Sequence, residues 1–176
     1  KVNGYIHFIL TLNNKKMIGL SDLRKFAKAV FGSIKEIENL PDLKNLGPDA
    51  LAITLNDFSD RIKKRKKTIY QVLMDQSVLS GIGNIYASDV LFEARVFPFK
   101  MANRLQPEEL KRLWRAIGKI LKLSLKLRGT STSDYRDTSG QPGAYTEKRL
   151  IYDREGSPCY ECGTKIKRVK LGGRSA

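Results

Sequence analysis

Apolar and polar positions in the first twenty residues follow the pattern of a β-hairpin. Residues 5–12 are rich in β-branched and aromatic side chains, residues 13–16 read Asn-Asn-Lys-Lys, and residues 17–20 are mostly apolar again. Two β-rich runs separated by a short polar turn are typical of antiparallel strands. We therefore predict a hairpin here.

From residue 68 to residue 127 the pattern becomes helical. Apolar side chains recur three and four positions apart within residues 69–73, 85–91 and 110–125, which predicts three helices with buried apolar stripes. Pro107 and the two glutamates after it suit the first turn of the third helix. Gly129 suits its end.

The remaining segments are predicted to connect these elements. Proline and glycine punctuate residues 39–56, and residues 61–67 form a run of six basic residues and one isoleucine. Together they look like a connection between two lobes, although a solvated helix end would have the same composition. Residues 130–143 have loop chemistry, and residues 148–152 predict a short strand.

The net charge of the chain indicates which class of partner it binds. Lysine and arginine number 33 against 18 acidic residues, a formal net charge of +15. Such an excess favours a polyanion, and nucleic acid is preferred over a membrane surface because no apolar stretch of about 18 residues occurs. The hydrophobic fraction, 41%, is that of a folded globular protein.

The two cysteines, Cys159 and Cys162, form a C-x-x-C pair. That spacing indicates either half of a metal site or a redox pair. With no secretion signal at the start of the chain, a reducing cytoplasmic compartment is expected.

Gly81 and Gly83 stand immediately before the second predicted helix, with Asn84 as its expected N-cap. Such a turn lets the backbone approach a phosphate, and the helix start offers free N–H groups. An ordinary tight turn between helices would look the same.

The surrounding residues carry a family resemblance. The segment 73–92 begins with LMDQ and ends with GIGNIYASDVLF, and it closely resembles the helix-two-turn-helix signature of the formamidopyrimidine-DNA glycosylase and endonuclease VIII family. Residues 22–26, 46–48 and 129–174 agree with further family segments in the same order. The resemblance covers essentially the whole chain.

This resemblance implies an α+β fold in four parts. Residues 1–55 would be the end of a β-sandwich amino-terminal domain, and residues 56–67 a basic linker. Residues 68–145 would form the helix-two-turn-helix DNA-binding domain with a lesion-capping loop. Residues 146–176 would form an incomplete zinc finger, the β-hairpin of a zinc ribbon.

The implied function is base-excision repair. The family resemblance implies a bifunctional DNA glycosylase and AP lyase that removes oxidised purines, such as 8-oxoguanine and formamidopyrimidines, from damaged double-stranded DNA. We expect a monomer associated with the bacterial nucleoid and no membrane partner.

The resemblance also assigns DNA contacts. Asn84, with Gly83 beside it, and Arg174 would grip phosphates flanking the lesion, since an amide at a helix start and a guanidinium on a hairpin both suit phosphate oxygens. We therefore expect Asn84 and Arg174 to converge on one stretch of backbone. Arg174 would also donate a proton in the second elimination step. Arg65 and Lys66 of the basic run would face phosphates.

Two further sets of residues would handle the extruded base. Arg24 would fill the hole left in the duplex and Phe26 would wedge beside the opposite base, although both could be ordinary residues at a strand edge. A small polar loop would close over the lesion, or could be a plain surface turn; its residues are Thr130, Ser131, Thr132, Ser133, Asp134 and Tyr135.

Zinc is the implied cofactor. Cys159 and Cys162 match the first half of a four-cysteine zinc ribbon, and the second pair is expected beyond Ala176. Two ligands alone do not make a structural zinc site.

The chain departs from the family pattern in several places. The family nucleophile is an amino-terminal proline with a neighbouring glutamate, followed later by a lysine. All three precede the matched region, so we expect sequence missing upstream. Tyr70 stands where the family commonly has a lysine, and Asn3 lies near a family histidine that touches DNA.

Two other functions fit the same residues. A noncatalytic damaged-DNA-binding protein would keep the DNA grip without the nucleophile. A basic ribosomal zinc-ribbon protein would instead bind structured RNA more tightly than abasic duplex.

Overall fold

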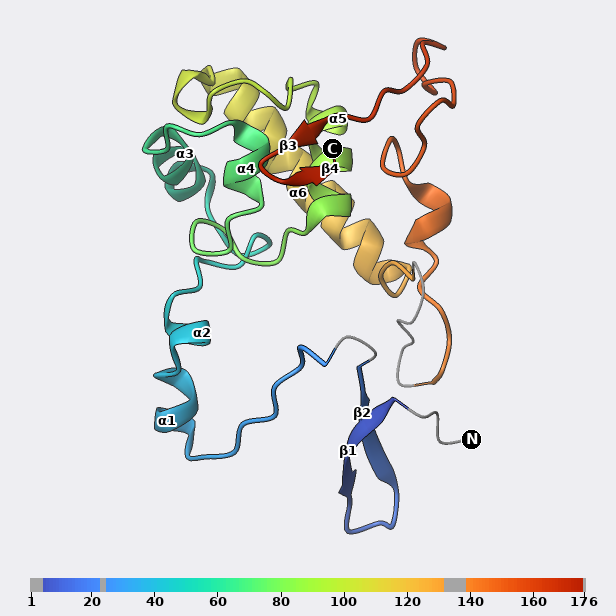
Figure 1. Cartoon of the computed structure of the whole chain (residues 1–176). Helices are drawn as coiled ribbons and strands as arrows, with labels where there is room; N and C mark the ends of the chain where they lie inside the picture. Colours follow the sequence, from blue (N-terminus) through green and yellow to red (C-terminus); the bar gives the residue numbers. More distant parts are fainter. Residues whose placement is uncertain (1–4, 23–24, 132–138, 176) are drawn as a thin grey trace. The chain divides into compact units, whose positions relative to one another are not determined.

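A computed structural model describes residues 5–22, 25–131 and 139–175. It divides the chain into two compact units, Lys1–Lys44 and Asn45–Ala176 (Figure 1). The boundary therefore lies before residue 45, whereas the sequence predicted the first part to extend to residue 55.

The first unit contains the predicted hairpin. Strands β1 (Ile6–Thr11) and β2 (Met17–Ser21) pair antiparallel. Two short helices follow, α1 (Ile34–Glu38) and α2 (Pro41–Lys44). The hairpin prediction is confirmed, while the β-sandwich to which we assigned it stays a prediction.

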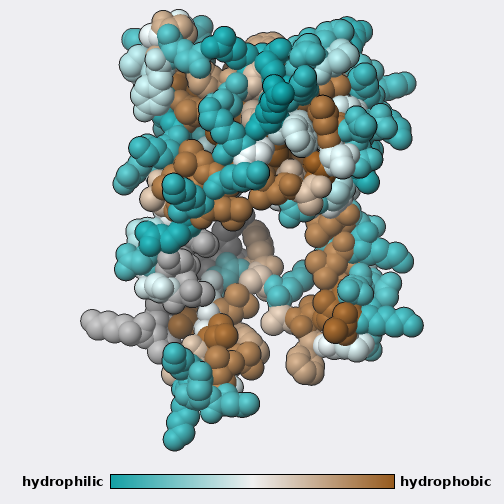
Figure 2. Space-filling model, turned by 180° about the vertical axis from the view of Figure 1, so that it is seen from behind, coloured by the Kyte–Doolittle hydropathy of each residue, from teal (hydrophilic) through white to brown (hydrophobic). Residues whose placement is uncertain are grey.

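None of these four elements contains a buried residue. Figure 2 shows hydrophobic side chains of this unit on the outside, among them Phe8, Ile9, Leu10, Ile18 and Ile34. A two-stranded hairpin is too small to enclose a core. The core of the described chain therefore lies in the second unit.

Helices α3 (Leu55–Lys63), α4 (Ile69–Leu73), α5 (Asn84–Ala94) and α6 (Pro107–Lys126) build the second unit. Thr54 and Thr68 cap α3 and α4 with their side-chain oxygens, and Pro107 opens α6 as predicted. The three predicted helices are confirmed, and α3 is an addition to them. None of the described helices is long and apolar enough to cross a membrane.

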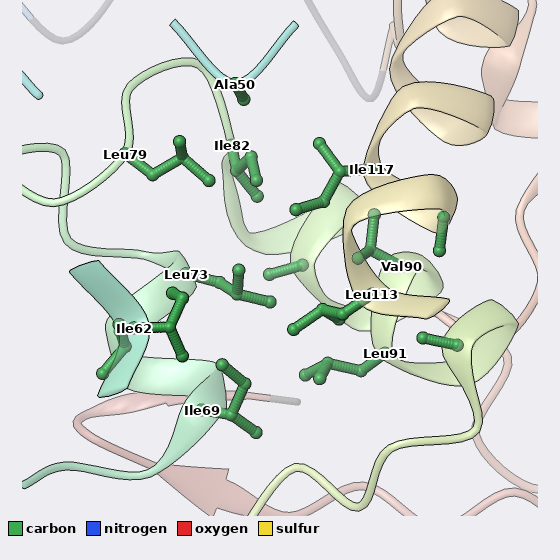
Figure 3. Close-up of a cluster of buried hydrophobic side chains, with 14 of the residues drawn as sticks. Ala50, Ile62, Ile69, Leu73, Leu79, Ile82, Val90, Leu91, Leu113 and Ile117 are labelled. Atoms are coloured by element: carbon green, nitrogen blue, oxygen red, sulfur yellow. The ribbon is translucent and has the colours of Figure 1, made fainter. Parts of the chain in front are cut away.

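The core gathers around α5. Figure 3 shows side chains from α3, α4, α5, α6 and the segments before α3 and after α4 meeting in one buried cluster. Its labelled members are Ala50, Ile62, Ile69, Leu73, Leu79, Ile82, Val90, Leu91, Leu113 and Ile117. At roughly 1.5–3 kcal/mol for each large apolar side chain buried, this cluster dominates the stability of the unit.

The linker predicted over residues 56–67 is wrong. Most of that segment is helix α3, whose Phe58 and Ile62 are buried in the core. The basic residues hid this pattern because they occupy the exposed face of the helix and the turn after it. Long charged side chains are compatible with an amphipathic helix, so the charge run belongs to the packed unit.

The strand predicted over residues 148–152 is also wrong. A 3₁₀ turn, η2 (Tyr145–Lys148), is followed by irregular backbone. The N–H groups of Leu150, Ile151 and Tyr152 donate to the buried Asp89 carboxylate of α5 at 3.0–3.3 Å. Because one carboxylate takes three successive N–H groups, the segment cannot form a strand ladder there.

The Tyr145 hydroxyl donates to the same carboxylate at 2.9 Å. Asp89 therefore fastens the chain after η2 to the central helix. Two further strands, β3 (Lys170–Leu171) and β4 (Arg174–Ser175), form a second hairpin near the end of the chain.

We predict that Asp89→Asn lowers the free energy of unfolding by about 2–4 kcal/mol, because an amide NH₂ would face buried N–H donors. Urea unfolding measures this change. Asp60→Asn, on the exposed face of α3, is the matched control and should change stability by less than about 0.5 kcal/mol. Equal stabilities of the two variants would contradict the role given to Asp89.

Gly47 marks a close approach of two backbone segments. Its N–H donates to Gln76 O at 2.8 Å, and a Cβ there would lie 2.6–2.8 Å from backbone atoms of Val78 and Leu79. We predict that Gly47→Ala lowers the free energy of unfolding by roughly 1–3 kcal/mol, which urea unfolding measures. A methyl group on Gly118, inside α6, would meet no atom within 4 Å. As the control, Gly118→Ala should therefore leave stability unchanged or raise it by up to about 1 kcal/mol.

Candidate nucleic-acid interface

The start of helix α5 differs from the prediction in one detail. Gly83 is the N-cap, in extended backbone with no side-chain cap bond, and Asn84 is the first helical residue. The predicted N-cap role of Asn84 is therefore wrong. Its side chain is not used for capping, and the first-turn N–H groups have no partner within the helix. An acceptor such as a phosphate would be favoured at this end.

The β3–β4 hairpin presents Arg174 on a tight turn. Gly172 and Gly173 have φ of 59° and 78°, the left-handed backbone that a two-residue hairpin turn of this kind requires. Leu171 is buried in the core, and Gly172 packs against the Gln71 side chain. The hairpin is thus held against α4, while the Arg174 side chain is exposed.

Asn84 and Arg174 lie on either side of one tyrosine. The Tyr70 hydroxyl donates to Asn84 Oδ1 and lies 3.1 Å from the carbonyl oxygen of Ser175. Figure 1 shows the hairpin beside α4 and α5. The structure therefore brings Asn84 and the strand that carries Arg174 together at Tyr70, while their convergence on one stretch of DNA backbone stays a prediction. The sequence had no signal for the tyrosine that joins them, except that Tyr70 departs from the family pattern.

Lys67 is a further cation at this place. With Tyr70 and Arg174 it lines a groove of about 220 Å³, and it ends the basic run that contains Arg65 and Lys66, all exposed. Asp75 also lines this groove; a hydrogen bond from the Ser77 hydroxyl lowers the pKa of the Asp75 carboxyl, and the nearby Lys67 and Arg65 lower it further. Lys67 was missed because a charge run does not reveal which member faces a groove.

The start of the expected lesion-capping loop is anchored to α5 and to Gly143. The Thr130 hydroxyl is 3.1 Å from the Tyr86 hydroxyl of α5, and Ser131 Oγ accepts the N–H of Gly143 at 2.8 Å. The other expected loop residues lie outside the described residues; they are Thr132, Ser133, Asp134 and Tyr135.

The expected wedge lies in the first unit. Arg24 is outside the described residues. Phe26 is 72% exposed, and its N–H donates to Asp22 Oδ2 at 2.7 Å. An exposed phenylalanine held at its backbone is suited to insertion between bases, and the wedge role of Phe26 stays a prediction.

The cysteine pair lies on a compact turn. The N–H of Cys159 donates to Thr164 O at 2.9 Å, and the N–H of Glu161 donates to Cys159 Sγ at 3.4 Å. Hydrogen bonds from Thr164, and then from Cys159, lower the pKa of the Cys162 thiol. A lower thiol pKa favours the thiolate that binds metals. Among the described residues, however, no group of three or more His, Cys, Asp or Glu side chains could hold a metal ion, so this pair does not by itself fit a structural zinc site.

Comparison with known proteins gives a consistent result. The family model of the formamidopyrimidine-DNA glycosylase H2TH domain matches residues 46–136. The formamidopyrimidine-DNA glycosylase of Desulforamulus reducens is 35% identical over 98% of this chain and 63% of its own length. That of Pelotomaculum thermopropionicum is 36% identical with the same coverage. The chain thus spans somewhat less than two thirds of these relatives.

Solved structures agree with the sequence matches. The MutM (Fpg) protein of Thermus thermophilus superposes with a TM-score of 0.88 at 33% identity, covering 100% of this chain and 67% of that one. The Lactococcus lactis Fpg, in complex with DNA containing an abasic site, gives 0.83 at 28% identity, covering 91% of this chain and 59% of that one. Since the family model covers more than half of the 176 residues, the chain belongs to the formamidopyrimidine-DNA glycosylase family.

Proposed function

We propose that this chain is the DNA-gripping part of a base-excision repair glycosylase that removes oxidised purines and then cleaves the abasic strand as an AP lyase. The observation that carries the proposal is the placement of Asn84 and Arg174 around Tyr70, on a surface that also includes Lys67. Lactococcus lactis Fpg, a structural neighbour, has been solved with DNA containing an abasic site and with DNA containing Fapy-dG. These neighbours support damaged duplex DNA as the partner.

In this proposal the residues of the chain bind and orient DNA. Neighbouring phosphates are held by the Asn84 amide, the N–H groups at the start of α5 and the Arg174 guanidinium. Arg65 and Lys66 extend the contact. Cations and a helix start on one face attract the phosphate backbone without reading sequence. Holding both flanking phosphates bends the strand and favours extrusion of the damaged base.

The remaining roles are proposed from the resemblance. Arg24 fills the hole left by the extruded base, Phe26 wedges beside the opposite base, and residues 130–135 close over the lesion. Arg174 donates a proton in the second elimination, which its exposed position beside the phosphate grip would allow.

Zinc is proposed as a structural cofactor of the finger. Cys159 and Cys162 would be two of its ligands, and the ion would stiffen residues 150–175 when bound. Further ligands are required from outside the described residues.

We predict that Asn84→Ala and Arg174→Ala each weaken binding to a duplex with an abasic-site analogue by about tenfold or more, because charged or helix-end contacts to phosphate contribute roughly 1.5–3 kcal/mol. Removing Arg174 should also reduce the slope of log affinity against log salt by about one. Fluorescence anisotropy at several salt concentrations measures both quantities.

Arg115→Ala is the matched control, because Arg115 is exposed on α6 and lines none of the grooves around Tyr70. It should leave the salt slope nearly unchanged. If Arg174→Ala and Arg115→Ala gave the same slope, the phosphate assignment of Arg174 would be withdrawn.

The catalytic part of the proposal is tested on the product of the complete gene. We predict that sodium borohydride traps a covalent adduct with duplex DNA containing 8-oxoguanine, because a lyase of this kind forms a Schiff base with the sugar. Gel electrophoresis detects the adduct, and undamaged duplex is the control. Tight binding without an adduct would instead favour a noncatalytic damaged-DNA-binding protein.

A further inference from the structure

Tyr70 occupies a position where three elements meet. Its side chain extends from α4, is 1% exposed, and reaches Asn84 at the start of α5 and Ser175 in β4 with its hydroxyl. The Ser88 hydroxyl of α5 also interacts with the phenol. A tyrosine that served packing alone would rarely have its hydroxyl shared by three elements.

The direction of the hydrogen bond between Tyr70 and Asn84 determines which end of the Asn84 amide is turned away from Tyr70. A neutral phenol has one proton to donate, and the amide oxygen of Asn84 can only accept. With Oδ1 turned to Tyr70, the NH₂ group of Asn84 is the opposite end of the amide, and it donates a long hydrogen bond of 3.4 Å to the Tyr152 hydroxyl. An NH₂ group is the end that suits a phosphate oxygen, which is an acceptor.

The tyrosine remains a donor under physiological conditions. Burial is the main cause that raises the pKa of Tyr70 above its usual value, so the hydroxyl keeps its proton. The same proton has a second acceptor, the Ser175 carbonyl, next to Arg174 in the chain. One hydroxyl thereby connects Asn84 to the residue that follows Arg174 in β4.

We propose that Tyr70 is a positioning residue of the DNA grip: its hydroxyl orients the Asn84 amide, with Oδ1 toward Tyr70 and NH₂ away from it, and ties it to the strand that carries Arg174. The proposal rests on the proposed function, since it presumes that Asn84 binds phosphate. It predicts that the hydroxyl of Tyr70 acts on DNA binding through Asn84.

A double-mutant cycle tests this prediction. The probe is a duplex with a tetrahydrofuran abasic-site analogue, and affinity is measured by fluorescence anisotropy. Tyr70→Phe, which keeps the ring, should weaken binding about five- to tenfold in the otherwise unchanged protein. In an Asn84→Ala background the same substitution should weaken binding less than about twofold, because the amide it orients is gone.

Tyr145→Phe is the structural comparison, because it removes a buried hydroxyl of the same unit that bonds to Asp89. It should lower the melting temperature, and any effect on affinity should be the same with Asn84 or alanine at position 84. If Tyr70→Phe behaved in that additive way, or left affinity unchanged, the positioning role would be refuted. If Asn84→Ala itself bound as tightly as the unchanged protein, the proposed phosphate grip would fail instead, so the two failures are distinguishable.

Discussion

The buried carboxylate of Asp89 is the interaction on which the second unit depends. It lies within the central helix α5 and accepts hydrogen bonds from the Tyr145 hydroxyl and from three successive backbone N–H groups of residues 150–152. A charge without partners in this position would be strongly destabilising, whereas four donors satisfy it. The irregular chain that leads to the cysteines and to the β3–β4 hairpin therefore starts from a fixed point on α5.

The candidate interface depends on the same helix at its other end. Asn84 begins α5, and the hairpin that carries Arg174 is held against α4 by buried Leu171 and by the contact of Gly172 with Gln71. Leu171 belongs to the packed core, and Gln71 is a partly buried residue of helix α4. Cations and N–H groups set on rigid elements lose little conformational entropy when they bind phosphate, which favours a preorganised grip.

Much of this organisation could be predicted from the sequence. The first hairpin, the start of α6 at Pro107 and the helices α4 and α5 follow from local periodicity and end signals, which depend on neighbouring residues only. The excess of positive charge pointed to a polyanion, and the motif around Asn84 pointed to the family. The expected convergence of Asn84 and Arg174, far apart in the chain, came from the family resemblance and not from any local pattern.

Other features were decided by tertiary structure. The basic run concealed α3, because burial of Phe58 and Ile62 outweighs a charged exposed face. Residues 148–152 have the composition of a strand, yet Asp89 takes their N–H groups. By itself the sequence predicted most of the local elements and indicated a polyanionic partner. The tertiary structure decided that Tyr70 joins Asn84 to the Arg174 hairpin, because hydrogen bonds between distant residues depend on packing that no local pattern contains.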